Sequence, residues 1–427
     1  MSRDRISDAE RVDLITELER LKAAAAAAQA KLTADLDASQ RAAQEAAGLP
    51  ARRVGVGIAA QVGLARRESP NRGAQHLGLA KVLVHEMPHT LDRLAAGDLT
   101  EWQATLLARE TGCLTREHRE YVDQALCADP ATLDGLGDRA VAAAAQKLAI
   151  RLDQEAVVRR RAKAQNERRV SLRPAPDTMT YLTALLPVEQ GVAVYAALTK
   201  AADQTRAAGD DDRGRGQVMA DTLVERCTGQ TEADQVPVAV NLVISDTSLL
   251  DGDPTPAHLD GHGPVPAACA RDLVAQALDT GTDTGAGVWL RRLFTHPATG
   301  ALVAMDSRQR KVPAGLAALV RLRDGGTCRT PWCDAPIRHT DHTTPAHADG
   351  ETSELNLTGR CEACNHAKEA PGWRARPRSR PGEPHRIEVT TPTGHQHQSH
   401  APPLPGLDRP TEAPRVEIGW ADLTLAA

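Results

Sequence analysis

The 427-residue chain is poor in aromatic side chains, with only five Trp, three Tyr and one Phe. A core with so few large rings must be filled mainly by Ala, Leu and Val, which suit closely packed helices better than a large β-sandwich. Hydrophobic residues make up 41% and charged residues 25% of the chain. This composition is typical of a globular protein, and it excludes a collagen-like or wholly disordered chain.

Long apolar runs are also absent. The longest, such as residues 238–244, fall far short of the roughly 18 residues that a membrane-spanning helix needs. The first ten residues, MSRDRISDAE, are charged and contain no apolar signal core. We therefore expect a cytoplasmic protein that does not bind a membrane.

The chain has no overall excess of positive charge, since its formal net charge is −5. That balance argues against a protein that coats nucleic acid along its whole length. Residues 307–386, however, hold 14 basic and nine acidic side chains, an excess of five positive charges. A basic module therefore follows an acidic region.

Residues 7–47 are predicted to form one long helix. Ser7 and Glu10 fit a capping box at its start, and Gly48 and Pro50 follow its end. Apolar side chains then recur at alternating spacings of four and three, as in a heptad seam: Leu14, Leu18, Leu21, Ala25, Ala28 and Leu32. The seam fits either a homodimer through this helix or a helix packed on its own domain, and the sequence does not choose between them.

The rest of the chain before residue 307 is predicted to be mainly α, with a smaller α+β part. Residues 75–165 have helical patterns, and one long helical stretch is expected over 136–169. Short strands are expected at 170–172, 179–185 and 236–244, and a hairpin at 288–305. A short helix is expected at 314–323, ahead of the clustered cysteines. After Trp373 the chain turns rich in Pro, Arg and His, and we expect a strand at 385–391 within loop or disorder.

Four of the eight cysteines lie within 37 residues, at Cys328, Cys333, Cys361 and Cys364. They form two pairs, Cys-x4-Cys and Cys-x2-Cys, with 27 residues between the pairs. Clustered pairs in a cytosolic chain are more often a metal site than disulfides. Four thiolates from two short loops suit tetrahedral structural zinc.

The segment between the cysteine pairs contains residues that structural zinc does not need. Asp341 precedes His342, Asn356 follows 14 residues later, and Asn365 nine residues after that. A carboxylate beside a histidine can hold a hard cation while the imidazole takes a proton. An Asn amide can orient the histidine, and a second Asn oxygen can complete a Mg²⁺ site.

The run HTDHTTPAHADGETSELNLTGRCEACNHAK resembles the ββα-metal fold of HNH endonucleases, in the variant whose third signature residue is Asn. The upstream region resembles the actinobacterial domain of unknown function of the DUF 222 type, which precedes such modules. The segments that carry this second resemblance are LVHEMPHTLDRLAAGDLTEWQATLLARET, LLPVEQGVAVYAAL and WLRRLFTHPATGALVAMD. We thus expect an N-terminal helix (1–50), a DUF 222-like domain (51–306), an HNH module (307–375) and a partly disordered tail (376–427).

The HNH resemblance implies roles for individual residues. His342 would be the general base that activates water against a DNA phosphodiester. Asp341 and Asn365 would hold a catalytic Mg²⁺ or Mn²⁺, with His366 as a weaker alternative ligand. Asn356 would hold the loop of His342, and the four cysteines would hold a structural Zn²⁺. Many family members have His where this chain has Cys364 and Asn365, so the resemblance does not imply their metal preference for this chain.

DNA is the partner that the basic module and the resemblance imply. The side chains expected to contact its backbone are Arg329, Arg338, Arg360, Lys368, Arg374 and Arg376. No helix has the pattern of a base-reading element, so no sequence preference is expected.

Two other functions fit parts of the sequence. One is a zinc-stabilised DNA-binding or interaction protein whose nuclease has decayed. The other is a zinc metalloprotease, because residues 85–89, HEMPH, match the HExxH motif. That chemistry needs both histidines on one unbroken helix, and Pro88 is expected to break it.

Overall fold

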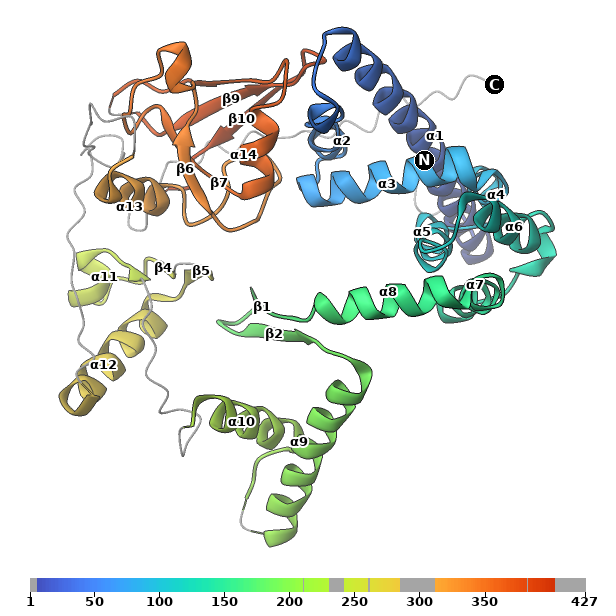
Figure 1. Ribbon diagram of the computed structural model, residues 1–427. Coiled ribbons are helices and arrows are strands. Elements are labelled where there is room, and N and C mark those ends of the chain that lie inside the picture. The colour runs from blue at the N-terminus through green and yellow to red at the C-terminus, as the bar shows by residue number, and fades with distance from the viewer. Residues whose placement is uncertain are drawn as a thin grey trace.

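The computed structural model of the protein describes residues 6–209, 211–229, 242–259, 262–284, 312–381 and 383–403. Within these ranges the chain is mainly helical, with small antiparallel sheets, as expected from its scarcity of aromatic side chains. In Figure 1 the C-terminal module lies beside the helices α1–α8, and the segments between these two parts of the sequence lie below them. A search of the described helices finds none with the length and hydropathy needed to cross a bilayer.

Helix α1 spans Asp8–Ala46 and confirms the predicted N-terminal helix. The Ser7 side chain accepts a hydrogen bond from the backbone N–H of Glu10, and the Glu10 carboxylate accepts one from the backbone N–H of Ser7 at 2.7 Å. Helix α1 packs on α3 (Pro70–Glu86) and α4 (Pro88–Ala96) through Ala23, Ala26 and Ala27. It is therefore part of the helical domain rather than a separate unit.

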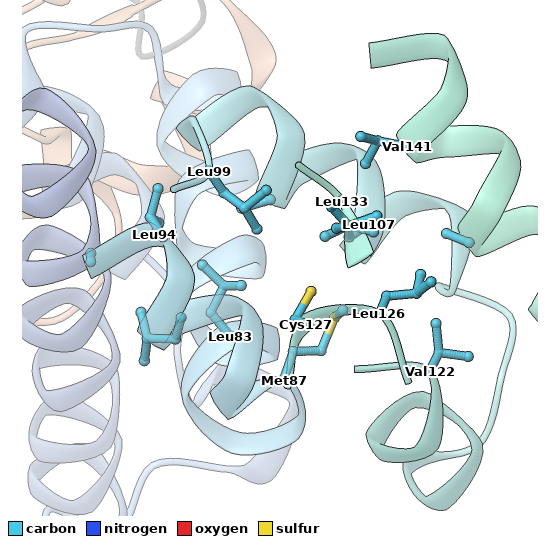
Figure 2. Close-up of a cluster of buried hydrophobic side chains, with 14 of the residues drawn as sticks. Leu83, Met87, Leu94, Leu99, Leu107, Val122, Leu126, Cys127, Leu133 and Val141 are labelled. Carbon is cyan, nitrogen blue, oxygen red and sulfur yellow. The ribbon is translucent and has the colours of Figure 1, made fainter. Parts of the chain in front are cut away.

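The helical domain has one continuous apolar core (Figure 2). Besides α1, α3 and α4, this core contains residues of α5 (Glu101–Glu110), α6 (Arg116–Cys127) and α7 (Asp138–Leu152), while α2 (Ile58–Arg66) packs on α3. Leu83, Met87 and Leu107 are completely buried at its centre. Alanines such as Ala104 and Ala145, also fully buried, let the helices approach closely.

The prediction of one long helix over 136–169 is wrong, because this segment contains two helices. Helix α7 ends at Leu152, and α8 spans Gln154–Asn166. Between them Asp153 has an extended backbone, with φ −154° and ψ 83°, and its side chain accepts from the backbone N–H of Ala156 at 2.7 Å. Asp153 therefore caps a new helix instead of continuing the first one.

The middle of the chain forms small units with little core. Strands β1 (Arg169–Pro174) and β2 (Thr180–Leu185) form an exposed hairpin, followed by α9 (Val188–Ala208) and α10 (Arg215–Thr228). The helices α9 and α10 extend away from the helical domain in Figure 1. Strands β3 (Leu242–Val243), β4 (Ala257–Leu259) and β5 (Gly263–Val265) form a sheet with α11 (Asp246–Leu250) and α12 (Ala267–Thr284) nearby. The expected hairpin at 288–305 and most of the strand at 236–244 lie outside the described residues.

The C-terminal module begins with α13 (Ala314–Arg323), as the sequence predicts. Strands β6 (His339–His342) and β7 (Leu357–Arg360) pair antiparallel, with the short helix η5 (Ala346–Ala348) in the connecting loop. Helix α14 (Glu362–Lys368) follows β7 directly and contacts β6. The order of these elements is therefore strand, strand, helix.

The chain after Trp373 is more ordered than its composition suggests. Strands β8 (Arg374–Pro377), β9 (Arg386–Thr390) and β10 (Gln396–His400) form an antiparallel sheet in the order β10-β9-β8. Strand β9 confirms the expected strand at 385–391, whereas β8 and β10 replace expected loop. Ile387 and Val389 are buried, so these residues pack as part of the module rather than as a tail. Residues 404–427 lie outside the described residues.

Candidate functional site

The four clustered cysteines come together as one buried group. Their sulfur atoms lie within 4.8 Å of one another, and none forms a disulfide. The Sγ atoms of Cys333 and Cys361 are 3.7 Å apart. Zinc–sulfur bonds of about 2.3 Å in a tetrahedron would place neighbouring sulfurs about 3.8 Å apart. The cluster could therefore hold a metal ion such as zinc.

Helix α14 contributes to this cluster through its first turn. Cys361 is the N-cap residue, and its sulfur accepts a hydrogen bond from the backbone N–H of Cys364 at 3.5 Å. Hydrogen bonds from the other thiols, Cys333 first, lower the pKa of Cys328, whereas the hydrogen bond with Cys328 raises the pKa of Cys364. Four sulfurs so close together cannot all ionise without a cation, and a divalent metal would offset that repulsion.

His342 ends strand β6 and is buried. Its Nε2 atom lies 2.8 Å from the Oγ1 atom of Thr352, which is also buried. Its Nδ1 atom lies on the other side of the ring, 3.7 Å from Oδ1 of Asp341. One ring nitrogen is therefore held by a hydroxyl, and the other is next to a carboxylate.

Asn356 fixes the loop that follows His342. Its Oδ1 atom accepts from the backbone N–H of Thr344 at 2.8 Å. Its Nδ2 atom donates to the carbonyl oxygens of Thr344 at 3.0 Å and Glu351 at 2.8 Å. Gly350 lies in this turn, where a Cβ atom would come 1.8 Å from the Thr344 carbonyl oxygen. The loop therefore needs both the amide of Asn356 and the glycine.

Asn365 and Lys368 lie one turn apart on α14 and so share a face of the helix. The Oδ1 atom of Asn365 is buried and has no hydrogen-bond partner, which is uncommon in a folded protein. The Nζ atom of Lys368 lies 3.0 Å from Oδ2 of Asp341 and also pairs with Glu369. His366, the alternative ligand, is exposed.

The carboxylate of Asp341 is adapted to a positive neighbour. Burial alone would raise its pKa, but the charge and hydrogen bond of Lys368 and the backbone N–H of His342 outweigh burial and lower the pKa. Asp341 is therefore ionised at neutral pH. Its oxygens and the unpartnered oxygen of Asn365 are of the hard kind that Mg²⁺ prefers as ligands.

The basic residues expected to contact DNA divide into two groups. Arg338, Arg374 and Arg376 are exposed, and the latter two alternate along β8 on one face of the sheet. Arg329 and Arg360 are 3% and 1% exposed, so the expectation that they contact DNA is wrong in this structure. Lys368, with a side chain that is 6% exposed, contacts Asp341 instead. Charge alone does not tell a surface arginine from a buried one.

Buried ion pairs connect the parts of the module. Asp324 accepts from Arg323 at 2.9 Å, from Arg329 at 2.8 Å and from the backbone N–H of Gly359 at 2.8 Å. Arg323 also contacts Glu354 at 2.7 Å. Although burial would raise it, the pKa of Asp324 is lowered by the charges of Arg323 and Arg329. This network, defined here as Arg323, Asp324, Arg329, Glu354 and His385, joins α13, β7 and the C-terminal sheet.

His385 completes the network and attaches the sheet to the module. Its Nδ1 atom lies 3.2 Å from Nη1 of Arg329, and its Nε2 atom lies 3.0 Å from the carbonyl oxygen of Leu355. Since Arg329 can only donate, Nδ1 accepts and Nε2 carries the proton. Burial, with the positive charges of Arg323 and Arg329, lowers the pKa of His385 to about 3. His385 is therefore neutral and structural.

The helical domain covers one side of α14. Arg53 donates to the carbonyl oxygen of Glu369 at 3.0 Å, and the hydroxyl of Thr393 donates to Gln61 at 3.3 Å. Gly57 has a φ of 88°, and a Cβ atom there would lie 2.6 Å from Nε1 of Trp373. Glycine is therefore needed at position 57, because the backbone is left-handed there and the Trp373 side chain leaves no room for a Cβ atom. Figure 1 shows α2 and α3 beside this module.

The HEMPH motif does not form a metal site. Helix α3 ends at Glu86 and α4 begins at Pro88, so the predicted break at the proline is confirmed. The carboxylate of Glu86 pairs with Arg119. The backbone N–H of His89 donates to Asp123 at 2.8 Å. The five residues therefore form a helix junction, and the protease alternative has no geometric support.

Comparison with known families assigns most of the chain to one family. The family model for a domain of unknown function, DUF222, matches residues 10–324. The chain belongs to this family. The match includes α1 and α13, so it is wider than the expected 51–306, and it ends at Asp324, before the first clustered cysteine. No curated protein and no solved structure matches the chain.

Proposed function

We propose that the C-terminal module of this DUF222 protein is a metal-dependent HNH endonuclease that hydrolyses DNA phosphodiester bonds. The observation that carries the proposal is the arrangement of Asp341, His342 and Asn365 beside a four-cysteine cluster. A strand pair followed by a helix bears these residues, in the order that a ββα-metal fold requires. The cysteines would hold a structural Zn²⁺.

His342 acts as the general base in this proposal. In the tautomer that this role requires, Nε2–H donates to the Thr352 hydroxyl, 2.8 Å away, and the lone pair of Nδ1, on the side of Asp341, takes a proton from water. Asn356 keeps the loop after His342 in place through its three amide hydrogen bonds. The residues that hold the ring are thus separate from those that would hold a cation.

Asp341 and Asn365 would hold the catalytic cation. When bound, Mg²⁺ or Mn²⁺ would stabilise negative charge on the scissile phosphate and the leaving oxygen. Lys368 already neutralises Asp341, and its ammonium would move toward the DNA backbone when a cation takes its place. The exposed Arg338, Arg374 and Arg376 would contact further phosphates, which predicts binding that weakens with salt.

The ion pair between Lys368 and Asp341 also favours a second candidate function. A cation already lies 3.0 Å from the carboxylate, as expected if the module binds DNA but no longer loads a catalytic metal. This decayed nuclease would keep the cysteine cluster and the exposed arginines.

A cleavage assay separates these functions. Zinc-loaded protein is incubated with supercoiled plasmid and Mg²⁺ or Mn²⁺, and nicked and linear products are measured. We expect His342→Ala to lose at least about 100-fold in rate at unchanged zinc content. His339→Ala, at an exposed position on the same strand, should cleave normally and is the matched control.

The outcomes are distinct. Undiminished cleavage by His342→Ala would show that His342 is not the base. Salt-sensitive DNA binding without cleavage by the wild type, with either metal, would favour the decayed nuclease.

We further propose that a second copy of the chain binds the exposed face of α1. The leucines of the predicted heptad seam are not covered by the chain's own domain. The protein would then be a homodimer, and sedimentation equilibrium at several concentrations tests this proposal.

A further inference from the structure

Helix α1 has two apolar faces on opposite sides. One face contains Ala23, Ala26, Ala27 and Ala34, which are at most 8% exposed and pack on the helical domain. The other is the seam of Leu14, Leu18, Leu21, Ala25, Ala28 and Leu32. At 100° per residue the two faces lie about 180° apart. The domain therefore cannot cover the seam.

The seam is solvent-exposed along its whole length. Leu14, Leu18, Leu21 and Leu32 are 48%, 59%, 64% and 69% exposed. Burying a leucine side chain is worth roughly 1.5–3 kcal/mol, and isolated large side chains on a surface need no explanation. Four leucines in one line at heptad spacing, however, match the pattern of a helix that binds another helix.

We propose that the seam binds the same seam of a second copy, with the two helices antiparallel. This arrangement rests on the proposed self-association and specifies its geometry. The spacings 4, 3, 4, 3, 4 read the same in both directions, so an antiparallel copy aligns all six positions. Leu18 then meets the partner's Ala28, and Leu21 meets the partner's Ala25.

The sizes of the side chains favour this direction. In the antiparallel pair, four of the six layers combine one leucine with one alanine, and the remaining two combine Leu14 with the partner's Leu32. A parallel pair would place alanine on alanine at Ala25 and at Ala28, leaving gaps between the helices there. Gaps at a helix interface forfeit packing energy, so the antiparallel pair fills the interface more evenly.

Charges beside the seam agree with the antiparallel direction. Glu17, whose carboxylate also pairs with Arg20 at 2.9 Å, and Lys31 flank the seam two heptads apart, so each meets its opposite on the partner. Lys31 is exposed and has no ion pair among the described residues. A parallel pair would instead bring Glu17 to Lys22, whose ammonium already lies 2.7 Å from Glu19. The antiparallel pair brings the two Lys22 side chains together, and Glu19 offsets this repulsion.

The resulting interface is closed. Both copies use the same residues about a two-fold axis near residue 23, so the contact makes a dimer and not a filament. The alanine-packed face of α1 stays on its own domain, and the two helical domains lie on opposite sides of the helix pair.

The first test is the molar mass by light scattering. We expect a dimer for the wild type and a monomer for Leu18→Asp/Leu21→Asp. Val12→Asp is the matched control, because Val12 is 61% exposed on α1 but lies off the seam. Glu17→Lys should weaken the dimer at least about tenfold, and adding Lys31→Glu should restore it. A monomeric wild type would overturn self-association and its geometry together.

The second test uses disulfide trapping to determine whether the two α1 helices are parallel or antiparallel. It is done in a Cys227→Ser background, which removes an exposed thiol. Leu14→Cys/Leu32→Cys should give a covalent dimer on mild oxidation. Leu14→Cys alone should not, because the two Cβ atoms would lie about 27 Å apart along antiparallel helices. Efficient trapping by Leu14→Cys alone would show a parallel pair, which overturns the antiparallel arrangement but leaves the homodimer intact.

Discussion

Different interactions stabilise the helical domain and the C-terminal module. The helical domain buries an unbroken cluster of Leu, Val, Met and Ala (Figure 2). The module has only small apolar clusters, among them Leu316, Val320 and Leu357, and it adds buried ion pairs and the four cysteines. A large core tolerates the loss of a few contacts, whereas a small one depends on each polar link.

The largest single-residue effect is expected at Asp324 in the module. Asp324→Asn would leave Arg323 and Arg329 buried without a negative partner between them, which should cost about 3–5 kcal/mol. The exposed pair of Asp8 and Arg11 is the control, and Asp8→Asn should change stability by less than about 1 kcal/mol. Urea unfolding followed by hydrogen exchange, in module peptides for Asp324→Asn and in α1 peptides for Asp8→Asn, measures both. Equal small losses would mean that the ion pairs do not hold the module together.

In the helical domain, a core truncation should act through a cavity instead. Leu107 is fully buried, so Leu107→Ala should cost about 2–5 kcal/mol. The exposed Leu136→Ala should cost far less. Exchange in residues 58–152 should rise for Leu107→Ala, while the module keeps its protection. A loss of protection in both regions would show that they unfold as one unit.

The two regions should also differ in their response to pH. The pKa of His385 is about 3 when folded and near 6.5 when unfolded. The unfolded module therefore binds more protons between these values, and its stability should fall as pH drops through this window, by up to about 1.4 kcal/mol per unit. The slope from His385 should disappear in His385→Gln. An identical slope in that variant would assign the pH dependence to other groups.

A smaller effect is expected at Thr352, which holds the Nε2 atom of His342. Thr352→Val removes the hydroxyl at similar volume and should slow plasmid cleavage by about tenfold, and shift the pH–rate profile, at unchanged zinc content. Thr352→Ser keeps the hydroxyl and should restore most of the rate and the original profile. If Ser and Val behave alike, the contact is structural and does not position the base.

Features that depend on neighbouring residues could be predicted from the sequence, whereas contacts between residues far apart in the sequence could not. The capping box at Ser7, the end of α3 before Pro88 and helix α13 depend on neighbouring residues and are confirmed. The spacing of the cysteines likewise predicted a cluster, because each of the two pairs lies within a short segment and can supply two ligands to one metal ion. The exposed heptad seam is visible in the sequence, but the opposite face of α1 buries alanines, Asp37 and Gln44 and gives almost no periodic apolar signal.

The network around Asp324 could not be predicted in this way. Arg329 and His385 are 56 residues apart in sequence and meet at 3.2 Å, and an arginine in a basic segment looks the same whether it is exposed or buried. Thr352 was missed for the same reason, since a lone threonine has no pattern that points to a histidine ten residues away. The catalytic roles of His342 and Asn365 come from resemblance and stay predictions.

We expect the fold of the module to depend on a metal at its four cysteines, and the fold of the helical domain to be independent of it. Hydrogen exchange of the zinc-loaded wild type, with and without a strong chelator, tests this claim directly. We predict that chelation removes protection from residues 325–400 and leaves residues 58–152 protected. Unchanged protection in residues 325–400 after complete loss of zinc would contradict the claim.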